Sequence, residues 1–252
     1  MMKWLAAALW AASSVAFAEG LTLGAGVEYT TGSYGAPEKT DTLYVPFFGK
    51  YETGRWTLRL TVPWLEITGP GNVVGVGGDR IVLPGATGPR RTESGLGDIV
   101  ASGFYNVISE RTAPVGVDLG AKVKFGTADE TKGLGTGEND VAVQADFFKP
   151  LGAASAFGSI GYRWYGDPPG VTLKDVFYFS LGASYRYTDT LSAGLAYDYR
   201  PSITPNGGEI SELTAFISQR VGPKTKLQPY LILGFGKASP DYGAGLQVSY
   251  AF

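Results

Sequence analysis

The sequence contains no histidine and no cysteine among its 252 residues, and these two absences exclude much enzyme chemistry at once. Without histidine, histidine-based catalytic triads and His-x-x-x-His zinc sites are impossible. Without cysteine, there is no disulfide framework, no thiolate metal site and no thiol nucleophile. A hydrolase that uses two paired carboxylates needs neither residue type and stays formally open. We expect no enzyme activity, no bound metal and no cofactor.

Charge is scarce as well, since only 17% of the residues are charged and the formal net charge is -2. Nucleic acid is therefore not expected as a partner, because its binding requires a basic patch. Glycine and aromatic residues are abundant instead, with 37 Gly and 13% aromatics. The mean hydropathy is nevertheless only +0.02. An apolar outer face averaged with a polar lumen gives such a value without any hydrophobic block.

Long apolar runs are missing except at the amino terminus. There, basic Lys3 precedes the apolar residues 4–15, and Ala16-Phe17-Ala18 has the small-x-small form of a cleavage site. The run is too short for a spanning helix, so residues 1–18 are predicted to be a signal peptide. No later stretch reaches about 18 uninterrupted apolar residues. An exported chain without such helices can span a membrane only as a barrel.

The last twelve residues alternate strictly between an apolar and a small or polar face. Such alternation predicts a strand with one apolar and one wet face. The chain ends on Phe252, with Tyr250 two places before it, and this resembles the closing strand of outer-membrane β-barrels. The resemblance implies that Tyr250 and Phe252 form an assembly signal read by the barrel-assembly machinery. An edge strand of a soluble β-sandwich is the alternative interpretation.

The remaining mature chain, residues 19–252, divides into about twelve alternating segments. They are residues 19–31, 40–52, 54–68, 93–108, 113–127, 138–151, 155–167, 174–188, 190–200, 209–221, 225–237 and a last segment that ends at Phe252. The odd-numbered connectors are mostly long and the even-numbered ones are tight, as in outer-membrane barrels with both termini in the periplasm. The sequence predicts a single all-β domain, a transmembrane antiparallel up-and-down β-barrel of about 12 strands. The connector 69–92, rich in Gly and Pro, is the best candidate for a loop that folds into the barrel or covers its mouth.

Charged residues within the strands are expected to face the lumen, because Arg or Lys on the lipid face at mid-bilayer costs roughly 2–4 kcal/mol. Period two gives the following candidates for the lumen or a constriction: Glu28, Arg59, Asp98, Asp118, Lys122, Lys124, Asp146, Arg163, Arg186, Asp198, Arg200, Glu212 and Arg220. In one interpretation they form a cross-strand salt-bridge lattice, with Arg186 beside Asp198 and Arg200. In the other, part of the set is a constriction that orients a permeating solute.

The same parity turns eight aromatic side chains inward, where they either fill space or form a slide for an aromatic or amphipathic solute. They are Tyr44, Phe48, Phe104, Phe148, Tyr165, Tyr178, Phe216 and Tyr230. No specific ligand motif accompanies them.

Several glycine-rich and aspartate-containing motifs are similar to those of a known family. They include Ser94-Gly-Leu-Gly-Asp-Ile99, residues 123–129, residues 133–140, residues 161–163 and residues 175–186. Together they resemble the transporter-like outer-membrane proteins described as "putative MetA-pathway of phenol degradation". The resemblance implies an outer-membrane barrel, linked in some members to uptake of aromatic compounds. It implies no catalytic or binding residues, and Asp98 and Asp140 match motifs that fit turns or strand ends.

The function expected from these patterns is a porin-like channel in the outer membrane of a Gram-negative bacterium. Small solutes would pass it passively, with aromatic or hydrophobic compounds as candidates, and lipid would surround it. The alternative is a closed barrel with a structural or surface-interaction role. A porin for acidic oligosaccharides is less well matched, because such porins need tracks of Arg and Lys, whereas acids and bases are mixed here.

Overall fold

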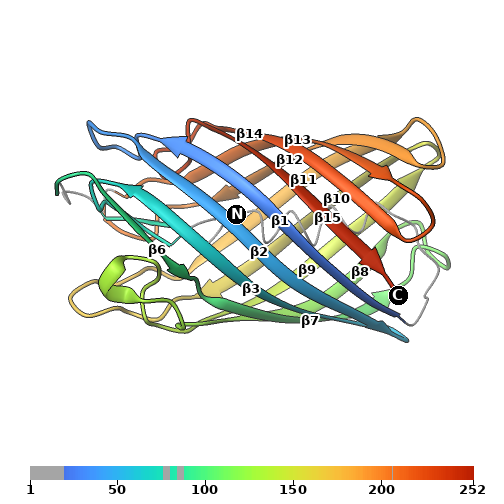
Figure 1. Ribbon diagram of the computed structural model, residues 1–252. Coiled ribbons are helices and arrows are strands. Elements are labelled where there is room, and N and C mark those ends of the chain that lie inside the picture. Colours follow the sequence, from blue (N-terminus) through green and yellow to red (C-terminus); the bar gives the residue numbers. More distant parts are fainter. Residues whose placement is uncertain (1–19, 76–79, 84–87, 206) are drawn as a thin grey trace.

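Figure 1 shows the computed structural model, which describes residues 20–75, 80–83, 88–205 and 207–252. The predicted signal peptide, residues 1–18, lies outside the described residues. The strands of the main sheet are β1 (Gly20–Gly32), β2 (Thr40–Thr53), β3 (Trp56–Gly69), β6 (Arg91–Leu96), β7 (Ile99–Ile108), β8 (Gly116–Phe125), β9 (Asp140–Leu151), β10 (Ala154–Trp164), β11 (Val176–Arg186), β12 (Leu191–Arg200), β13 (Ile210–Arg220), β14 (Thr225–Gly234) and β15 (Tyr242–Ala251).

The sheet closes into a barrel because β2 pairs with both β1 and β3, which joins the two ends of the strand order. β1 pairs with β2 and with β15, β2 pairs onward with β3, and all neighbours are antiparallel. β6 and β7 both pair with β3, along consecutive stretches of it, and therefore share one position in the wall. Thirteen strands thus fill twelve positions, and the predicted antiparallel up-and-down barrel of about 12 strands is confirmed.

The prediction of one continuous strand over residues 93–108 is wrong in one respect. The segment is interrupted between Leu96, the end of β6, and Ile99, the start of β7. Thr61 of β3 pairs with Val100, whereas Trp64 pairs with Leu96, so the partner strand carries one extra residue there. Pro63 lies at this point of β3 and has no N–H for the ladder, although its carbonyl accepts a 2.9 Å hydrogen bond from Gly97 N. The result is a β-bulge in the wall.

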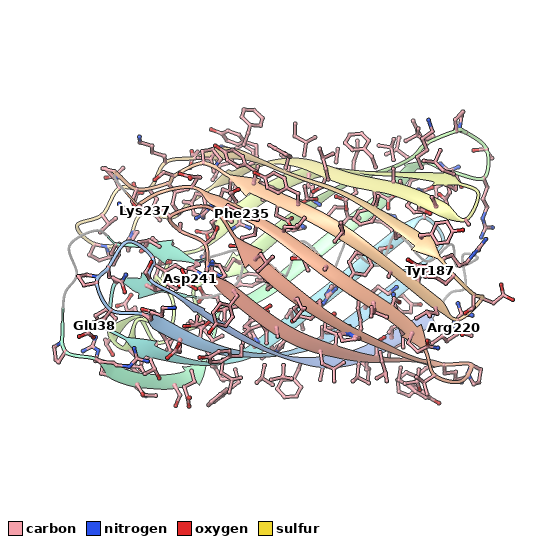
Figure 2. All side chains as sticks on the ribbon, turned by 90° about the horizontal axis from the view of Figure 1, so that it is seen from above. Glu38, Tyr187, Arg220, Phe235, Lys237 and Asp241 are labelled. Atoms are coloured by element: carbon pink, nitrogen blue, oxygen red, sulfur yellow. The ribbon has the colours of Figure 1, made fainter. Side chains whose placement is uncertain are left out.

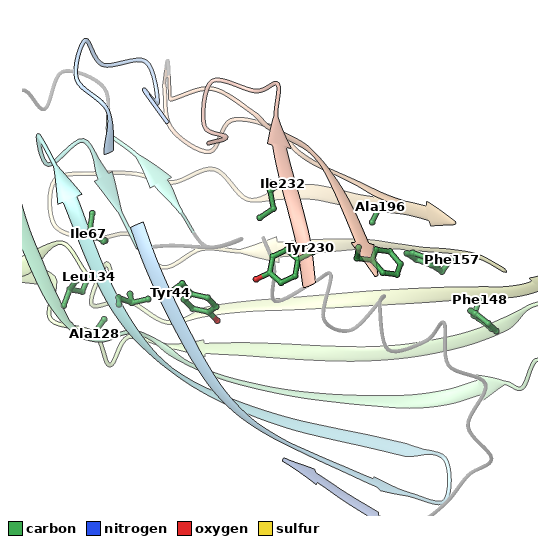
Figure 3. Packing of buried hydrophobic residues seen from close by; sticks show 11 residues of the cluster. Tyr44, Ile67, Ala128, Leu134, Phe148, Phe157, Ala196, Tyr230 and Ile232 are labelled. Atoms are coloured by element: carbon green, nitrogen blue, oxygen red, sulfur yellow. The ribbon is translucent and has the colours of Figure 1, made fainter. Parts of the chain in front are cut away.

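Alternation along the strands separates an outer from an inner face. Large apolar side chains such as Leu58, Leu119, Leu181 and Leu231 are exposed on the outside, as a lipid-facing surface requires. All eight aromatic residues predicted to face inward are buried. Figure 3 shows Tyr44, Tyr230 and Phe148 within one buried cluster of the barrel interior. The period-two assignment of the two faces is therefore confirmed.

Many inward aromatic side chains lie close over a glycine on the neighbouring strand. The directly opposed pairs are Gly24 with Phe48, Gly120 with Phe104, Gly161 with Tyr178, Gly182 with Phe157, Gly194 with Phe216 and Gly245 with Tyr230. A Cβ at any of these glycines would overlap the opposing ring. Glycine thus lets bulky side chains rest against the wall instead of crossing the lumen.

The two ends of the barrel differ in their connections. Residues 54–55, 109–115, 152–153, 187–190 and 221–224 connect strands at one end, called here the short-turn end. The C-terminus lies at this end, on the right of Figure 1. Residues 33–39, 70–90, 126–139, 165–175, 201–209 and 235–241 connect strands at the opposite, long-loop end.

Helical structure is minimal in the described chain. One 3-10 turn, η2 (Glu130–Lys132), lies in a connection at the long-loop end. The described residues contain no helix with the length and apolar character needed to cross a membrane.

Candidate functional site in the barrel lumen

The connector 69–92 packs onto the interior at the long-loop end. Its short strands β4 (Val73–Val74) and β5 (Ile81–Val82) pair with each other. Val73 and Val82 are buried against Tyr34, Ile210 and Ala238, which come from two other long loops and the start of β13. The sequence-based expectation of a loop that covers the mouth or enters the barrel is thus met by its described parts.

Ile81 extends this apolar contact across the barrel end. It is 2% exposed and packs with Tyr165, Leu173, Val176 and Ile203, which lie at or just beyond the ends of β10, β11 and β12. The described part of the connector therefore touches both sides of the long-loop end rather than lying along one edge.

Arg80 is the charged centre of this inserted segment. Its side chain is 2% exposed, and its Nη1 lies 3.1 Å from Glu212 Oε1 and 3.0 Å from the carbonyl oxygen of Ala238. Its guanidinium lies 5.2 Å from the ring centroid of Tyr34. Burial alone would lower the pKa of Arg80, but the fields of Tyr34, Glu212 and Glu28 raise it overall. Arg80 is therefore held as a cation, and removing either member of such a buried pair is strongly destabilising.

Further hydrogen bonds attach the backbone of the same loop to the wall. Arg200, the last residue of β12, donates to the carbonyl oxygen of Arg80 at 3.1 Å and to Tyr165 Oη at 2.8 Å. Thr204 Oγ1 donates to Val82 O at 3.0 Å, and Thr40 Oγ1 donates to Asn72 Oδ1 at 3.1 Å. The predicted lumen residue Arg200 thus holds the loop.

The acids near Arg80 explain why a cation is buried there. Asp198 of β12 and Glu212 of β13 stand directly opposite each other and are both buried. Glu28 of β1 is buried as well and accepts a 3.2 Å hydrogen bond from Tyr230 Oη. Like charges directly opposite on neighbouring strands are destabilising, so an inserted guanidinium offsets their repulsion.

A second cluster surrounds Lys124 of β8. Its Nζ lies 3.2 Å from Asp98 Oδ2, at the bulge, and 3.1 Å from Asp140 Oδ2, at the start of β9. Asp98 also accepts a hydrogen bond from Ala128 N, and Asp140 accepts one from Gly166 N. Asp98, Lys124 and Asp140 thus lie at strand ends and join two long loops to the wall.

A third group occupies the middle of β8 and β9. Lys122 Nζ and Tyr178 Oη both donate to Gln144 Oε1 at 2.9 Å, and the Gln144 amide nitrogen donates to Asp146. Asp118 accepts from Asn106 Nδ2 at 2.6 Å and stands directly opposite Asp146.

Arg163, on β10, faces this group from the neighbouring strand. Its guanidinium lies 5.4 Å from the ring centroid of Tyr165 and 5.9 Å from that of Tyr178. The charge is therefore placed against two inward aromatic faces, which is a favourable position for a guanidinium.

At the short-turn end the prediction that Arg186 lies beside Asp198 and Arg200 is wrong. Arg186, the last residue of β11, pairs with Ser192, whereas Asp198 pairs with Ser180 near the other end of β12. The tight turn 187–190 sets this register, because Tyr187 N bonds to Leu191 O. Residues equally far from a hairpin turn face each other, so period two alone cannot place a pair.

The expected salt-bridge lattice is likewise largely replaced by opposed like charges. Lys50 stands opposite Arg59, and Arg220 stands opposite Lys226, the former pair lying on β2 and β3 and the latter on β13 and β14. Arg59 is placed 4.2 Å from the ring centroid of Phe48. Among the described wall residues, one ion pair links two directly opposed strand positions as the lattice would require, and it is the pair of Lys124 and Asp140.

The structure also contains functional candidates that the sequence did not single out. Arg80 lies in a connector without periodicity, so nothing assigned it a face. Lys226 lies at the start of β14, on the inward side by its pairing with Arg220. Its inward parity could have been read from Gln228 and Tyr230, two and four places further on. The described residues contain no group of three or more acidic side chains arranged to hold a metal ion.

Several solved structures share this architecture. The COG4313 outer membrane channel from Pseudomonas putida F1 superposes with a TM-score of 0.70 at 16% identity, over 94% of this chain and 97% of that chain. The translocator domain of autotransporter NalP from Neisseria meningitidis gives 0.54 at 13% identity, over 100% and 94%. The KdgM porin gives 0.50 at 12% identity, over 92% and 99%. At these identities the likeness establishes the fold.

Sequence comparison adds the family. No curated protein sequence matches the chain. A family model, described as "Putative MetA-pathway of phenol degradation", matches residues 31–252, which is nearly the whole barrel. The chain belongs to this family.

Proposed function

We propose that this protein is a passive channel for small solutes in the outer membrane of a Gram-negative bacterium, with aromatic or hydrophobic compounds as the candidate solutes. The observation that carries the proposal is a closed barrel with an apolar outer face and a charged lumen, whose one end holds an inserted loop. In this role, lumen width, the inward charges and the loop select the solute.

The comparisons support the same class of function. The COG4313 protein is named an outer membrane channel and KdgM a porin, and both are covered almost completely by this chain. The family description concerns phenol degradation, and buried aromatic side chains line the interior. Channels of this kind perform no covalent chemistry, in keeping with a chain that lacks histidine and cysteine.

Membrane placement follows from the same architecture. The long-loop end faces the outside and the short-turn end the periplasm, as in other bacterial barrels. Tyr250 and Phe252 expose their rings on the outer face, with centroids 5.0 Å apart. There they would contact lipid, and during assembly they would be available to the barrel-assembly machinery.

The test is single-channel conductance of refolded residues 19–252, the predicted mature form, in a planar bilayer under a salt gradient. Steady current steps are expected, and their reversal potential gives the charge preference. Folding is checked separately by heat-modifiable gel migration. A protein that is folded and inserted yet carries no current would refute the channel. The closed barrel, acting through its outer loops, would then be the better account.

A further inference from the structure

The inward charges of the barrel differ between its two ends. Carboxylates gather with Arg80 at the long-loop end, in Glu28, Asp198 and Glu212. At the short-turn end, five basic residues occur on the strands that run from β11 round to β3. They are Arg186 at the end of β11, Arg220 at the end of β13, Lys226 at the start of β14, Lys50 near the end of β2 and Arg59 near the start of β3.

Three of these bases border one cavity at the short-turn end. Arg186, Arg220 and Lys226 line a space of about 160 Å³, which is several times the roughly 30 Å³ that a water molecule occupies in the liquid. Figure 2 shows Arg220 at the end of the barrel opposite to Lys237 and Asp241. The cavity thus opens at the mouth that would face the periplasm.

Strand register brings the three bases together. Arg186 is opposite Ser192, Ser192 is opposite Ser218, and Arg220 follows two places later on the same face and stands opposite Lys226. The row therefore reads base, hydroxyl, hydroxyl, base, base across β11 to β14. Two of its bases directly oppose each other, an unfavourable arrangement that a bound anion would relieve.

Carboxylates are scarce in the lining of this cavity. Glu52 pairs with Lys50 at 2.7 Å, outside the cavity lining. Asp189 is the one carboxylate among the lining residues, at the exposed tip of the turn. In the described chain neither Arg186 nor Arg220 forms an ion pair with a carboxylate. Asp118 and Asp146 lie on β8 and β9 and do not line the cavity.

The remaining lining is apolar or bears hydroxyl groups. Phe148, Pro150 and Leu191 supply apolar surface, whereas Ser155 and Ser184 add hydroxyls to those of the row. Guanidinium and ammonium groups bind carboxylates through charge-assisted hydrogen bonds, and the apolar surface suits the body of a small organic molecule. Such a lining suits an amphipathic anion better than an inorganic ion or a neutral hydrocarbon.

We infer that the short-turn mouth holds a binding site for small organic carboxylates with an apolar or aromatic body, in which Arg220 and Lys226 bind the carboxylate and Arg186 assists. This inference rests on the proposed channel function and narrows its solute class. Mixed charge in the sequence argued against a basic track. In the folded barrel, however, three bases line one cavity at the short-turn mouth.

Binding is tested with benzoate as the probe and benzyl alcohol as its neutral analogue, by calorimetry on the refolded protein in zwitterionic micelles at low salt. The variant R220Q/K226Q removes the two central charges. The control K149Q/K224Q removes two exposed charges near the same end, neither of which lines the cavity. Benzoate affinity is expected to fall at least about tenfold in R220Q/K226Q, to stay unchanged in the control, and to weaken with added salt.

The results separate this site from the channel itself. Equal affinity for benzoate and benzyl alcohol, or no loss of benzoate affinity in R220Q/K226Q shown folded by gel migration, would overturn the site even if the protein conducts. If the wild type and the control bind benzoate but carry no current in a bilayer, the site stands and the channel function fails. Conductance together with a loss of benzoate affinity confined to R220Q/K226Q supports both.

Discussion

The ion pair between Arg80 and Glu212 should decide whether the inserted loop stays in place. The substitution Arg80→Met keeps the length and apolar stem of the side chain but leaves Glu212 buried without its cation. Both side chains are only 2% exposed, so solvent screens the pair very little. Removing one partner of such a pair costs about 3–5 kcal/mol. At roughly 1.4 kcal/mol per factor of ten, the ratio of docked to undocked loop falls about a hundred- to a few-thousand-fold.

The assay is single-channel recording of the variant beside the wild type. Arg80→Met should raise the open probability or the mean conductance, because the loop leaves the long-loop mouth. Arg91→Met is the matched control, since Arg91 flanks the same loop but its side chain is 59% exposed and lies 3.9 Å from Glu93.

A double variant separates the effect of the unpaired Glu212 charge from the effect of replacing the Arg80 side chain. In Arg80→Met with Glu212→Met, no charge of the pair is left buried alone, and replacement of a buried pair by apolar side chains is often neutral. The double variant should therefore conduct more like the wild type than Arg80→Met does. Unchanged recordings in Arg80→Met, from protein shown to be folded, would refute the idea that the Arg80–Glu212 ion pair holds the loop in place.

Three further results are expected from the wall. Gly245→Ala should lower the free energy of unfolding by about 1–3 kcal/mol in urea titrations, because the new methyl overlaps the Tyr230 ring, whereas Gly49→Ala, with only a 3.5 Å neighbour, should change it little. Lys124→Met should destabilise the barrel by about 3–5 kcal/mol, because two buried carboxylates lose their cation, and a loss below 1 kcal/mol would contradict this. Deletion of Phe252 should lower the yield of heat-modifiable barrel in cells but not in detergent refolding, and equal yields in both would remove its role as an assembly signal.

Much of this architecture could be predicted because period two is a local property. Side chains alternate between the two faces of a strand, so the sequence of one strand is enough to assign its outer and inner residues. The inward placement of Tyr44, Phe104 or Phe216 therefore needed no knowledge of neighbouring strands. The interruption between β6 and β7 could not be seen in the same way. A single extra residue beside Pro63 leaves the alternation on each side intact, so the segment still resembles one strand.

Cross-strand partners need register in addition to parity. Arg186 and Asp198 both face inward, but they lie at unequal distances from the turn near Asp189, and only Ser192 can therefore stand opposite Arg186. Equal spacing from the turn was available in the sequence and would have prevented the error. The position of Arg80 could not be predicted in either way. It depends on a contact between the loop and Glu212, which lies 132 positions further along the chain.

Opposite charges on the wall and on the inserted loop stabilise the docked position of the loop. Asp198 and Glu212 face each other on neighbouring strands, an arrangement that the barrel alone would disfavour, and Arg80 supplies the compensating cation from another part of the chain. At the opposite mouth Arg220 and Lys226 also stand opposite each other, and residues 221–224 connect their strands by a short turn. A carboxylate bound in the cavity at that end would place a negative charge beside these two bases. At both ends, like charges on neighbouring strands favour a nearby charge of the opposite sign. At the long-loop end the chain itself supplies that charge, in Arg80.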